Sequence, residues 1–306
     1  MINYKMMTLC VLTTCLSNFG LAQESFQQDF GPRLSPDGKS VVYYSYRNDK
    51  LPDIYLLDLD SRTESQITAS TSSWDLNPTW SSDGSFIYFS SNRDGEMSIF
   101  RIKPDGSSLE KVTKPKKGFR QSEISFSADG KFMLYAEFRP DKKTALILRN
   151  TTSNEVNVVL ESKKSGDEFY KPALHPNGNE IVFLKNMAKD STYVFDLFSL
   201  DVSTKKITNL TNSPNSSERM PNWSQDGAYL LYSSNTNGQT FDLYKRNHKT
   251  GKTKQVSFFA DRQELNASLG HSKLIYDAGN YGMETDGDTF IFMADENGKN
   301  IEQLTH

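Results

Sequence analysis

Acidic side chains recur along the chain at a spacing that would gather them around one opening. Five of them precede apolar segments at this spacing: Asp29, Asp75, Glu168, Glu218 and Glu264. Two carboxyl groups roughly 5–10 Å apart in an open cleft can serve as acid and base, as in glycoside hydrolysis. Carboxylates that pair with arginine would instead hold loops in place. The arginines that could pair with them are Arg47, Arg93, Arg139 and Arg219.

We expect Asp29, Glu168 and Glu264 to lie at the mouth of a central channel. Aromatic residues in the segments just before the repeated strands add a second expectation, because those positions need no large ring for packing within the repeat. Large aromatics and arginine dominate the energetics of many protein interfaces. We therefore predict a partner-binding surface formed by Trp74, Asp75, Arg93, Phe169, Tyr170, Glu218 and Arg219.

Other residue patterns give little support for catalysis. The histidines have no acid or nucleophile at an informative spacing, and we expect each on the surface, apart from the others: His175, His248, His271 and His306. Serine occurs without the Gly-x-Ser-x-Gly pattern of a hydrolase nucleophile. The acidic run 284–288 provides only half of a calcium-binding loop, and we interpret it as a turn. The sequence thus predicts no catalytic residues, no metal site and no cofactor, and it favours a protein that is not an enzyme.

The charge balance bears on the kind of partner, and the first residues predict export. The chain has 306 residues with 35 basic and 38 acidic side chains, so its charge gives no reason to expect a nucleic-acid partner. Residues 6–16 form an apolar segment too short to span a bilayer, and small residues follow at 20–22. We predict a signal peptide over 1–22 and a periplasmic or secreted mature protein without a transmembrane helix. The alternative is a lipoprotein anchored at Cys15.

The elements that must position these residues repeat along the chain. Ser-x-Asp-Gly turns at 35–38, 81–84, 127–130 and 224–227, with variants at 175–178 and 269–272, start 45 to 49 residues apart. An apolar strand follows each turn, and most repeats end in Thr or Ser. This period, with four strands per unit, is typical of a β-propeller. We predict an all-β, six-bladed propeller of four-stranded antiparallel blades over 23–306, with blades at 29–68, 75–113, 120–160, 168–211, 218–257 and 263–305.

The repeats resemble those of the TolB-type propeller. The second repeat carries the pattern almost throughout, at Pro78, Trp80, Ser81, Asp83, Gly84, Arg93, Gly95 and Thr113. The resemblance covers residues 29–305 and implies a six-bladed propeller and a periplasmic location. TolB-type proteins carry an additional α/β domain ahead of the propeller, where we expect only the signal-like segment here. This propeller repeat serves many unrelated roles, so the resemblance does not fix an activity.

Two functions from different classes remain open. The first is a non-catalytic protein-binding or scaffold module of the bacterial cell envelope, with a protein or envelope component as partner. It would use the face of the disc that carries the long loops between strands two and three and between blades. The second is an enzyme that processes a carbohydrate or peptide at an acidic channel mouth. Pairing of the mouth carboxylates with arginine would weaken the second hypothesis.

Overall fold

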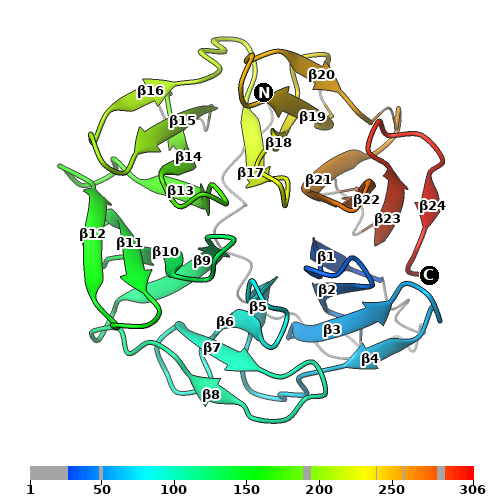
Figure 1. Cartoon of the computed structure of the whole chain (residues 1–306), viewed down its shortest axis with the longest axis horizontal. Coiled ribbons are helices and arrows are strands. Elements are labelled where there is room, and N and C mark those ends of the chain that lie inside the picture. Colours follow the sequence, from blue (N-terminus) through cyan, green and yellow to red (C-terminus); the bar gives the residue numbers. More distant parts are fainter. Residues whose placement is uncertain (1–26, 48–50, 189–193, 239, 258, 281–286) are drawn as a thin grey trace, which may run out of the picture.

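The computed structural model describes residues 27–47, 51–188, 194–238, 240–257, 259–280 and 287–306. The predicted signal peptide and the alternative anchor at Cys15 lie outside the described residues, as does most of the acidic run 284–288. The described chain forms six separate four-stranded sheets arranged around a central axis (Figure 1). All neighbouring strands within a sheet are antiparallel, so the predicted six-bladed, four-stranded propeller is confirmed.

Each blade uses its four strands in chain order, from the innermost to the outermost (Figure 1). The first two blades comprise β1 (Asp29–Leu34), β2 (Ser40–Ser45), β3 (Asp53–Asp58), β4 (Glu64–Gln66), β5 (Asp75–Trp80), β6 (Ile87–Ser91), β7 (Ser98–Ile102) and β8 (Glu110–Lys111). The next two comprise β9 (Arg120–Phe126), β10 (Phe132–Phe138), β11 (Thr144–Asn150), β12 (Val156–Glu161), β13 (Phe169–Leu174), β14 (Glu180–Asn186), β15 (Phe195–Asp201) and β16 (Ile207–Asn209). The last two comprise β17 (Glu218–Trp223), β18 (Tyr229–Ser234), β19 (Asp242–Asn247), β20 (Thr253–Gln255), β21 (Gln263–Gly270), β22 (Lys273–Gly279), β23 (Thr289–Asp295) and β24 (Glu302–Gln303).

The Ser-x-Asp-Gly turn is held by its own side chains. In the first blade the Ser35 hydroxyl donates to Asp37 Oδ1 at 2.6 Å and accepts the N–H of Ser40 at 2.9 Å. Gly38 adopts a φ of 73°, which glycine accepts without the steric penalty of a side chain. The equivalent serine–aspartate bonds occur at Ser81, Ser127 and Ser224. The motif therefore encodes the hairpin between the first and second strands of a blade.

The threonine or serine near the end of most repeats closes the blade. Thr68 Oγ1 accepts the N–H of Ile54 and donates to Asp53 Oδ1, both at 3.0 Å. The same backbone N–H on the third strand is satisfied in other blades by Thr113, Thr211, Ser257 and Thr305. Each hydroxyl thus satisfies a buried donor that the short outer strand leaves unpaired.

Apolar side chains between blades form the core. Ile54 of blade one packs with Phe89 of blade two in one cluster of buried residues. Tyr43 of blade one and Ile275 of blade six belong to another. Blades one and six therefore join through the same face packing as their neighbours, with no strand shared between their sheets. Burial of this apolar surface is the main stabilising contribution, at about 25 cal/mol per Å².

Every innermost strand contains a bulge at the same position. The register shifts there in all six blades. The residue at the bulge has a positive φ in each: Gly31, Asn77, Glu123, Lys171, Met220 and Asn266. Such a bulge bends the strand and redirects the residues beside it, and all six residues line the central channel.

Candidate functional site

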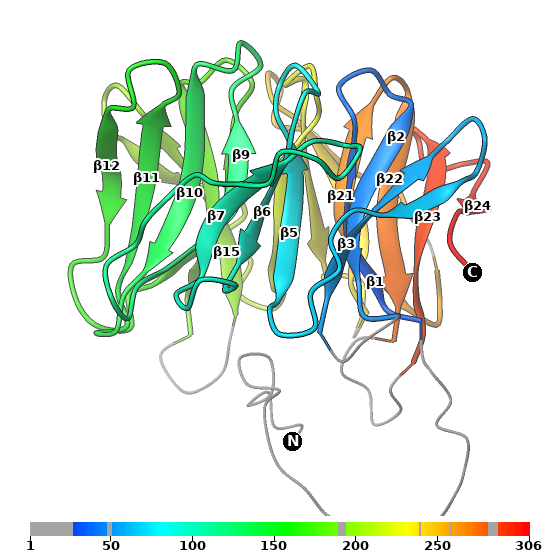
Figure 2. The same ribbon diagram turned by 90° about the horizontal axis from the view of Figure 1, so that it is seen from below.

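The disc has two different faces (Figure 2). The hairpins between first and second strands lie together on one face. There Gly227 of one hairpin comes so close to the preceding hairpin that an added Cβ would lie 2.6 Å from the His175 ring. The turns between second and third strands, and the linkers between blades, lie on the opposite side, which we call the loop-rich face. The predicted partner-binding residues all lie at or near the loop-rich face.

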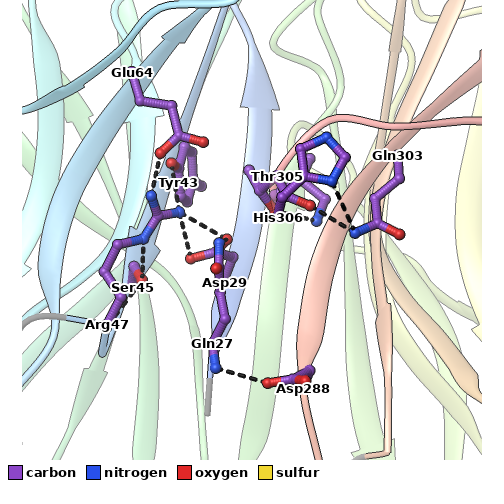
Figure 3. A network of polar contacts seen from close by, with 11 residues as sticks. Gln27, Asp29, Tyr43, Ser45, Arg47, Glu64, Asp288, Gln303, Thr305 and His306 are labelled. Carbon is purple, nitrogen blue, oxygen red and sulfur yellow. Dashed lines mark hydrogen bonds and ion pairs between the residues drawn. The ribbon is translucent and has the colours of Figure 1, made fainter. Parts of the chain in front are cut away.

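Asp29 does not line an open mouth. Its carboxylate is fully buried and accepts bonds from Arg47 Nη2 at 2.9 and 2.8 Å (Figure 3). The same guanidinium contacts the Tyr43 hydroxyl at 2.9 Å, the Ser45 hydroxyl and the Glu64 carboxylate. Charge-assisted bonds of this kind satisfy a carboxylate that water cannot reach. Arg47 therefore joins the start of β1 to the turn between β2 and β3, at the loop-rich end of blade one.

The residues just before β1 join this end of blade one to the last blade. The Thr289 N–H donates to the Gln27 carbonyl at 2.8 Å, and Gln28 forms a parallel bridge with Thr289. The backbone N–H of Gln27 donates to Asp288 at 2.7 Å, and its side chain donates to Asp29 (Figure 3). These bonds fasten blade six to blade one at the loop-rich face.

Blade two repeats the arrangement of blade one. Arg93 Nη2 lies 2.7 Å from Asp75 Oδ2, and Asp75 is fully buried. The guanidinium of Arg93 also lies over the Phe89 and Phe100 rings, at 5.3 and 5.2 Å from their centroids. In blade three, Arg139 pairs with Glu137 at 3.3 Å. Asp29 and Asp75 thus act as arginine-paired structural carboxylates, which weakens the hypothesis of an acidic catalytic mouth.

Glu218 and Glu264 are buried, and no arginine in the described part of the chain pairs with either. Burial, together with the carboxylate of Asp196 in the preceding blade, raises the pKa of Glu218 to about 7. Burial likewise raises the pKa of Glu264 to about 8, with Asp242 of the preceding blade adding to the effect. These side chains can hold a proton near neutral pH, but they are 1% and 0% exposed, so a substrate cannot reach them.

Blade four departs from the expected frame by one residue. Phe169 is the pairing partner of Lys185 on the second strand of its blade, and Asp29 is the pairing partner of Ser45 in blade one. Phe169 therefore occupies the position that a buried carboxylate has in blade one. Its ring is 4% exposed and packs on Phe183. Glu168 instead precedes the strand, half-buried, and accepts a bond from the Tyr170 hydroxyl. A partner has no direct access to the Phe169 ring in this structure.

The structure brings together a row of rings and guanidinium groups near the loop-rich ends of blades three to five. Arg120 lies 5.5 Å from the Phe138 ring centroid, and Phe138 lies 6.2 Å from Tyr170. Tyr170 meets Phe195 edge-on at 5.5 Å, and Arg219 covers Phe195 at 4.8 Å. We call these five side chains the aromatic–arginine band. Phe195 is buried and supports the exposed or half-buried others.

Sequence reasoning found two of these five residues, Tyr170 and Arg219. Arg120 was missed, although it lies 46 residues after Trp74 and so holds the same position in the next repeat. Phe138 was missed because only the fold brings it beside Tyr170. Trp74 itself is half-buried, and its backbone N–H donates to Asn92.

The expectation for the histidines is corrected by the packing of the hairpins. His175 is buried, because the hairpin of blade five and the Trp223 ring cover it. His248 is exposed, as expected, but its ring lies 4.7 Å from that of His175. Burial lowers the pKa of His175 below its ordinary value. Both His175 ring nitrogens contact backbone groups, Nδ1 in its own hairpin and Nε2 at Gly227 of the next. His175 therefore joins the hairpins of blades four and five.

The described residues contain no group of three or more His, Cys, Asp or Glu side chains placed to hold a metal ion. No helix long and apolar enough to cross a membrane occurs among them either.

Comparison with known proteins places the fold in a family. Residues 21–197 match the family model described as the TolB beta propeller domain. Dipeptidyl-peptidase 5 of Porphyromonas endodontalis is 24% identical over 254 residues, which cover 67% of this chain and 36% of that protein. A TolB homolog of Chlorobium luteolum is 30% identical over 117 residues, or 38% of this chain and 26% of that protein. The chain thus matches about a quarter to a third of the length of these relatives.

Solved structures agree on the fold. A TolB-type protein from Agrobacterium tumefaciens superposes with a TM-score of 0.65 at 16% identity, covering 87% of this chain and 88% of that one. At this identity the likeness concerns architecture alone. Since the family model covers more than half of the chain, and the six blades match its architecture, this protein belongs to the TolB β-propeller domain family.

Proposed function

We propose that this protein is exported and binds another protein through its loop-rich face, without catalysing a reaction. The aromatic–arginine band is the observation that carries the proposal. Arg120 is exposed and Tyr170 is half-buried, so both can be reached by a partner. Aromatic rings and arginine together bury a large area and bond in several directions, which is why they dominate many interfaces.

The chemistry of the band indicates the kind of partner. Two cationic side chains, Arg120 and Arg219, flank the aromatic rings. The Glu168 carboxylate accepts a bond from the Tyr170 hydroxyl, and that of Asp167 pairs with Lys185 at 2.9 Å, so the two arginines outweigh the remaining negative charge of Glu168. A partner segment that combines acidic and apolar side chains would fit this surface best.

The other predicted partner-binding residues support the face in different ways. Trp74 is half-buried just before β5, at the loop-rich end of blade two. Arg93 has a side chain that is 19% exposed, and buried Asp75 fixes its orientation. Glu218 is the first residue of β17; it is buried and precedes Arg219 directly. We propose that Trp74, Arg93 and the band form the contact surface, while the buried carboxylates hold it rigid.

The cellular setting follows from two considerations. The N-terminal segment 1–22 has the pattern of a signal peptide, which predicts export. Among the relatives, a TolB homolog of Chlorobium luteolum matches 38% of this chain, and a Tol-Pal system protein TolB of Syntrophus aciditrophicus matches 12% of it. We therefore propose a periplasmic location and a cell-envelope protein as partner.

An enzymatic function is the second candidate, because Glu218 and Glu264 can carry protons near neutral pH and one relative is a dipeptidyl-peptidase. Their burial argues against direct contact with a substrate. Hydrolysis of peptides or oligosaccharides that is lost in both Glu218→Gln and Glu264→Gln would favour this candidate over the binding function.

A capture experiment tests the binding function. The mature protein is immobilised and exposed to envelope extract, alongside the double variant Trp74→Ala/Arg120→Ala and the control Lys249→Ala on the opposite face. We expect the wild type and the control to retain the same envelope protein and the double variant to lose it. Equal capture by all three proteins would contradict the proposed surface.

A further inference from the structure

The central channel encloses a cavity that the proposed binding surface does not use. It offers about 80 Å³ to water-sized molecules, and residues of all six innermost strands line it. This volume has room for several water molecules or for one small oxyanion group. The polar residues that matter for its chemistry are Arg33, Asn77, Glu123, Lys171 and Asn222.

Arg33 presents unsatisfied donors to this cavity. Its backbone carbonyl accepts the Trp80 indole N–H at 3.0 Å, which fixes the residue in β1. Its Nη1 donates to the carbonyls of Pro32 and Asn266 at 2.9 and 3.2 Å. Within the described part of the chain, Nε and Nη2 have no hydrogen-bond partner, and neither atom is sealed from solvent. A guanidinium held at one nitrogen can offer the other two as a fork.

Asp277 is the carboxylate whose charge acts most strongly on Arg33, and one of its oxygens already accepts hydrogen bonds from other groups. Asp277 Oδ2 accepts the Gly31 N–H at 2.7 Å and the Asn266 side-chain N–H at 2.8 Å. The charge of Asp277 also favours the Arg33 cation through space. Burial disfavours the Arg33 cation and lowers its pKa, and the charge of Asp277 offsets part of this effect. Arg33 itself lines the channel.

A second cation enters from the opposite side of the ring. Arg33 belongs to blade one and Lys171 to blade four, which face each other across the channel (Figure 1). Lys171 Nζ lies 3.4 Å from Glu123, whose other oxygen accepts the Lys171 backbone N–H at 2.8 Å. Glu123 thus orients the lysine and offsets one of the two positive charges. The polar groups that line the cavity retain a net positive charge.

Neutral acceptors complete the lining. The Asn77 amide donates to the Ser122 hydroxyl and the Asn222 amide donates to the Ala267 carbonyl, both at 3.0 Å. Their amide oxygens are left to accept bonds from a guest molecule. Asn77 and Lys171 hold positive φ angles at the strand bulge, like the equivalent residues of the other blades, and the bulge turns them toward the channel that they line.

We propose that the channel binds a small molecule bearing a carboxylate or phosphate group. Nε and Nη2 of Arg33 receive the oxyanion as a two-pronged pair. Lys171 adds positive charge from the opposite side, and the amide oxygens of Asn77 and Asn222 accept hydroxyl or amino groups of the same molecule. This site is distinct from the aromatic–arginine band, so it can exist whether or not the band binds a protein.

Calorimetric titration of the mature protein tests the proposal. The probes are inorganic phosphate, citrate and gluconate, each added at constant ionic strength against sodium chloride. We expect saturable binding of at least one probe, and the three arms separate phosphate from carboxylate and hydroxylated carboxylate. Arg33→Gln should weaken that binding by about tenfold or more, since a charge-assisted pair is lost. Lys249→Gln, which removes an exposed cation on the hairpin face, should leave it unchanged.

Further outcomes decide the case if a variant folds poorly. Arg33→Lys keeps the charge but loses the fork, and Lys171→Gln removes the opposite cation. Each should weaken binding relative to Lys249→Gln. The proposal is overturned if none of the three probes binds saturably, or if the folded Arg33 and Lys171 variants bind as tightly as the wild type.

Discussion

Arg93 forms an ion pair with the buried carboxylate of Asp75, at 2.7 Å, at the loop-rich end of blade two. The pair joins the first strand of the blade to the turn between its second and third strands. Blade one contains the same relationship between Asp29 and Arg47. These two carboxylates, whose spacing suggested acid–base chemistry, are thus part of the scaffold, and the contact surface that we propose consists of Trp74, Arg93 and the aromatic–arginine band.

Removal of Arg93 should destabilise the protein, because Asp75 would remain buried without its counter-charge. We expect Arg93→Ala to lower the free energy of unfolding by about 3 kcal/mol. The matched control is Arg62→Ala, whose pair with Glu302 is exposed and should contribute less than about 1 kcal/mol. Denaturant unfolding of both variants measures the difference. Equal losses would show that Asp75 does not depend on Arg93.

Glu264 should make stability depend on pH. Its pKa rises from 4.5 to about 8 on folding, so between these values the folded state binds more protons than the unfolded state. The free energy of unfolding contributed by this group therefore falls as pH rises through that window. Glu264→Gln removes the titration and should raise the melting temperature relative to wild type at pH 8.5, with little change at pH 5.

The control for this prediction is Glu155→Gln, which replaces an exposed carboxylate at the start of the blade-three outer strand. It should shift the melting temperature equally, and only slightly, at both pH values. A Glu264→Gln effect that is the same at pH 5 and pH 8.5 would contradict burial of a protonated carboxyl group.

The hairpin face should be sensitive to a single methyl group at Gly227. This glycine and Gly84 have nearly the same φ, 72° and 71°. An added Cβ at Gly227 meets the His175 ring at 2.6 Å, whereas at Gly84 the nearest atom, on Pro36, lies 3.7 Å away. Both alanine variants should lose about 1–2 kcal/mol from the backbone conformation. Gly227→Ala should lose more than Gly84→Ala in denaturant unfolding, and equal losses would mean that the hairpins separate freely.

The closing threonine should contribute through its hydroxyl group. In Thr68→Val the buried N–H of Ile54 and the carboxylate of Asp53 both lose a hydrogen-bond partner. We expect a loss of about 1–3 kcal/mol in the free energy of unfolding. Thr63→Val, on an exposed turn of the same blade, should stay within about 0.5 kcal/mol of wild type. A Thr68→Val variant as stable as Thr63→Val would show that the hydroxyl is dispensable.

The sequence predicted the architecture because the information for it is local. Each hairpin is encoded within a few residues, as in the bonds of Ser35 and Asp37, and the spacing between hairpins sets the number of blades. The Ser-x-Asp-Gly residues recur in four repeats, with variants at the same spacing in the other two, and so identify the frame without knowledge of neighbouring blades. The same locality explains the one frame error, since nothing within blade four indicates that Phe169, and not Glu168, faces Lys185.

The properties of the site were harder to predict because they arise between blades. Glu218 and Glu264 are buried beside aspartates about 22 residues earlier in the chain, in the preceding blade. Arg120 meets Phe138 within a blade, but Phe138 meets Tyr170 only across a blade boundary. Contacts of this kind depend on side-chain direction in the assembled ring, which periodicity alone does not give.

The dissociation constant of the captured envelope protein tests the central claim most directly. It is measured by calorimetry for the wild type, the double variant Trp74→Ala/Arg120→Ala and the control Lys249→Ala, with the melting temperature of each recorded in parallel. We predict that the double variant binds about 30- to 1000-fold more weakly, corresponding to a loss of about 2–4 kcal/mol, while its melting temperature stays close to that of wild type. A double variant that binds as tightly as the control would contradict the assignment of the loop-rich face as the binding surface.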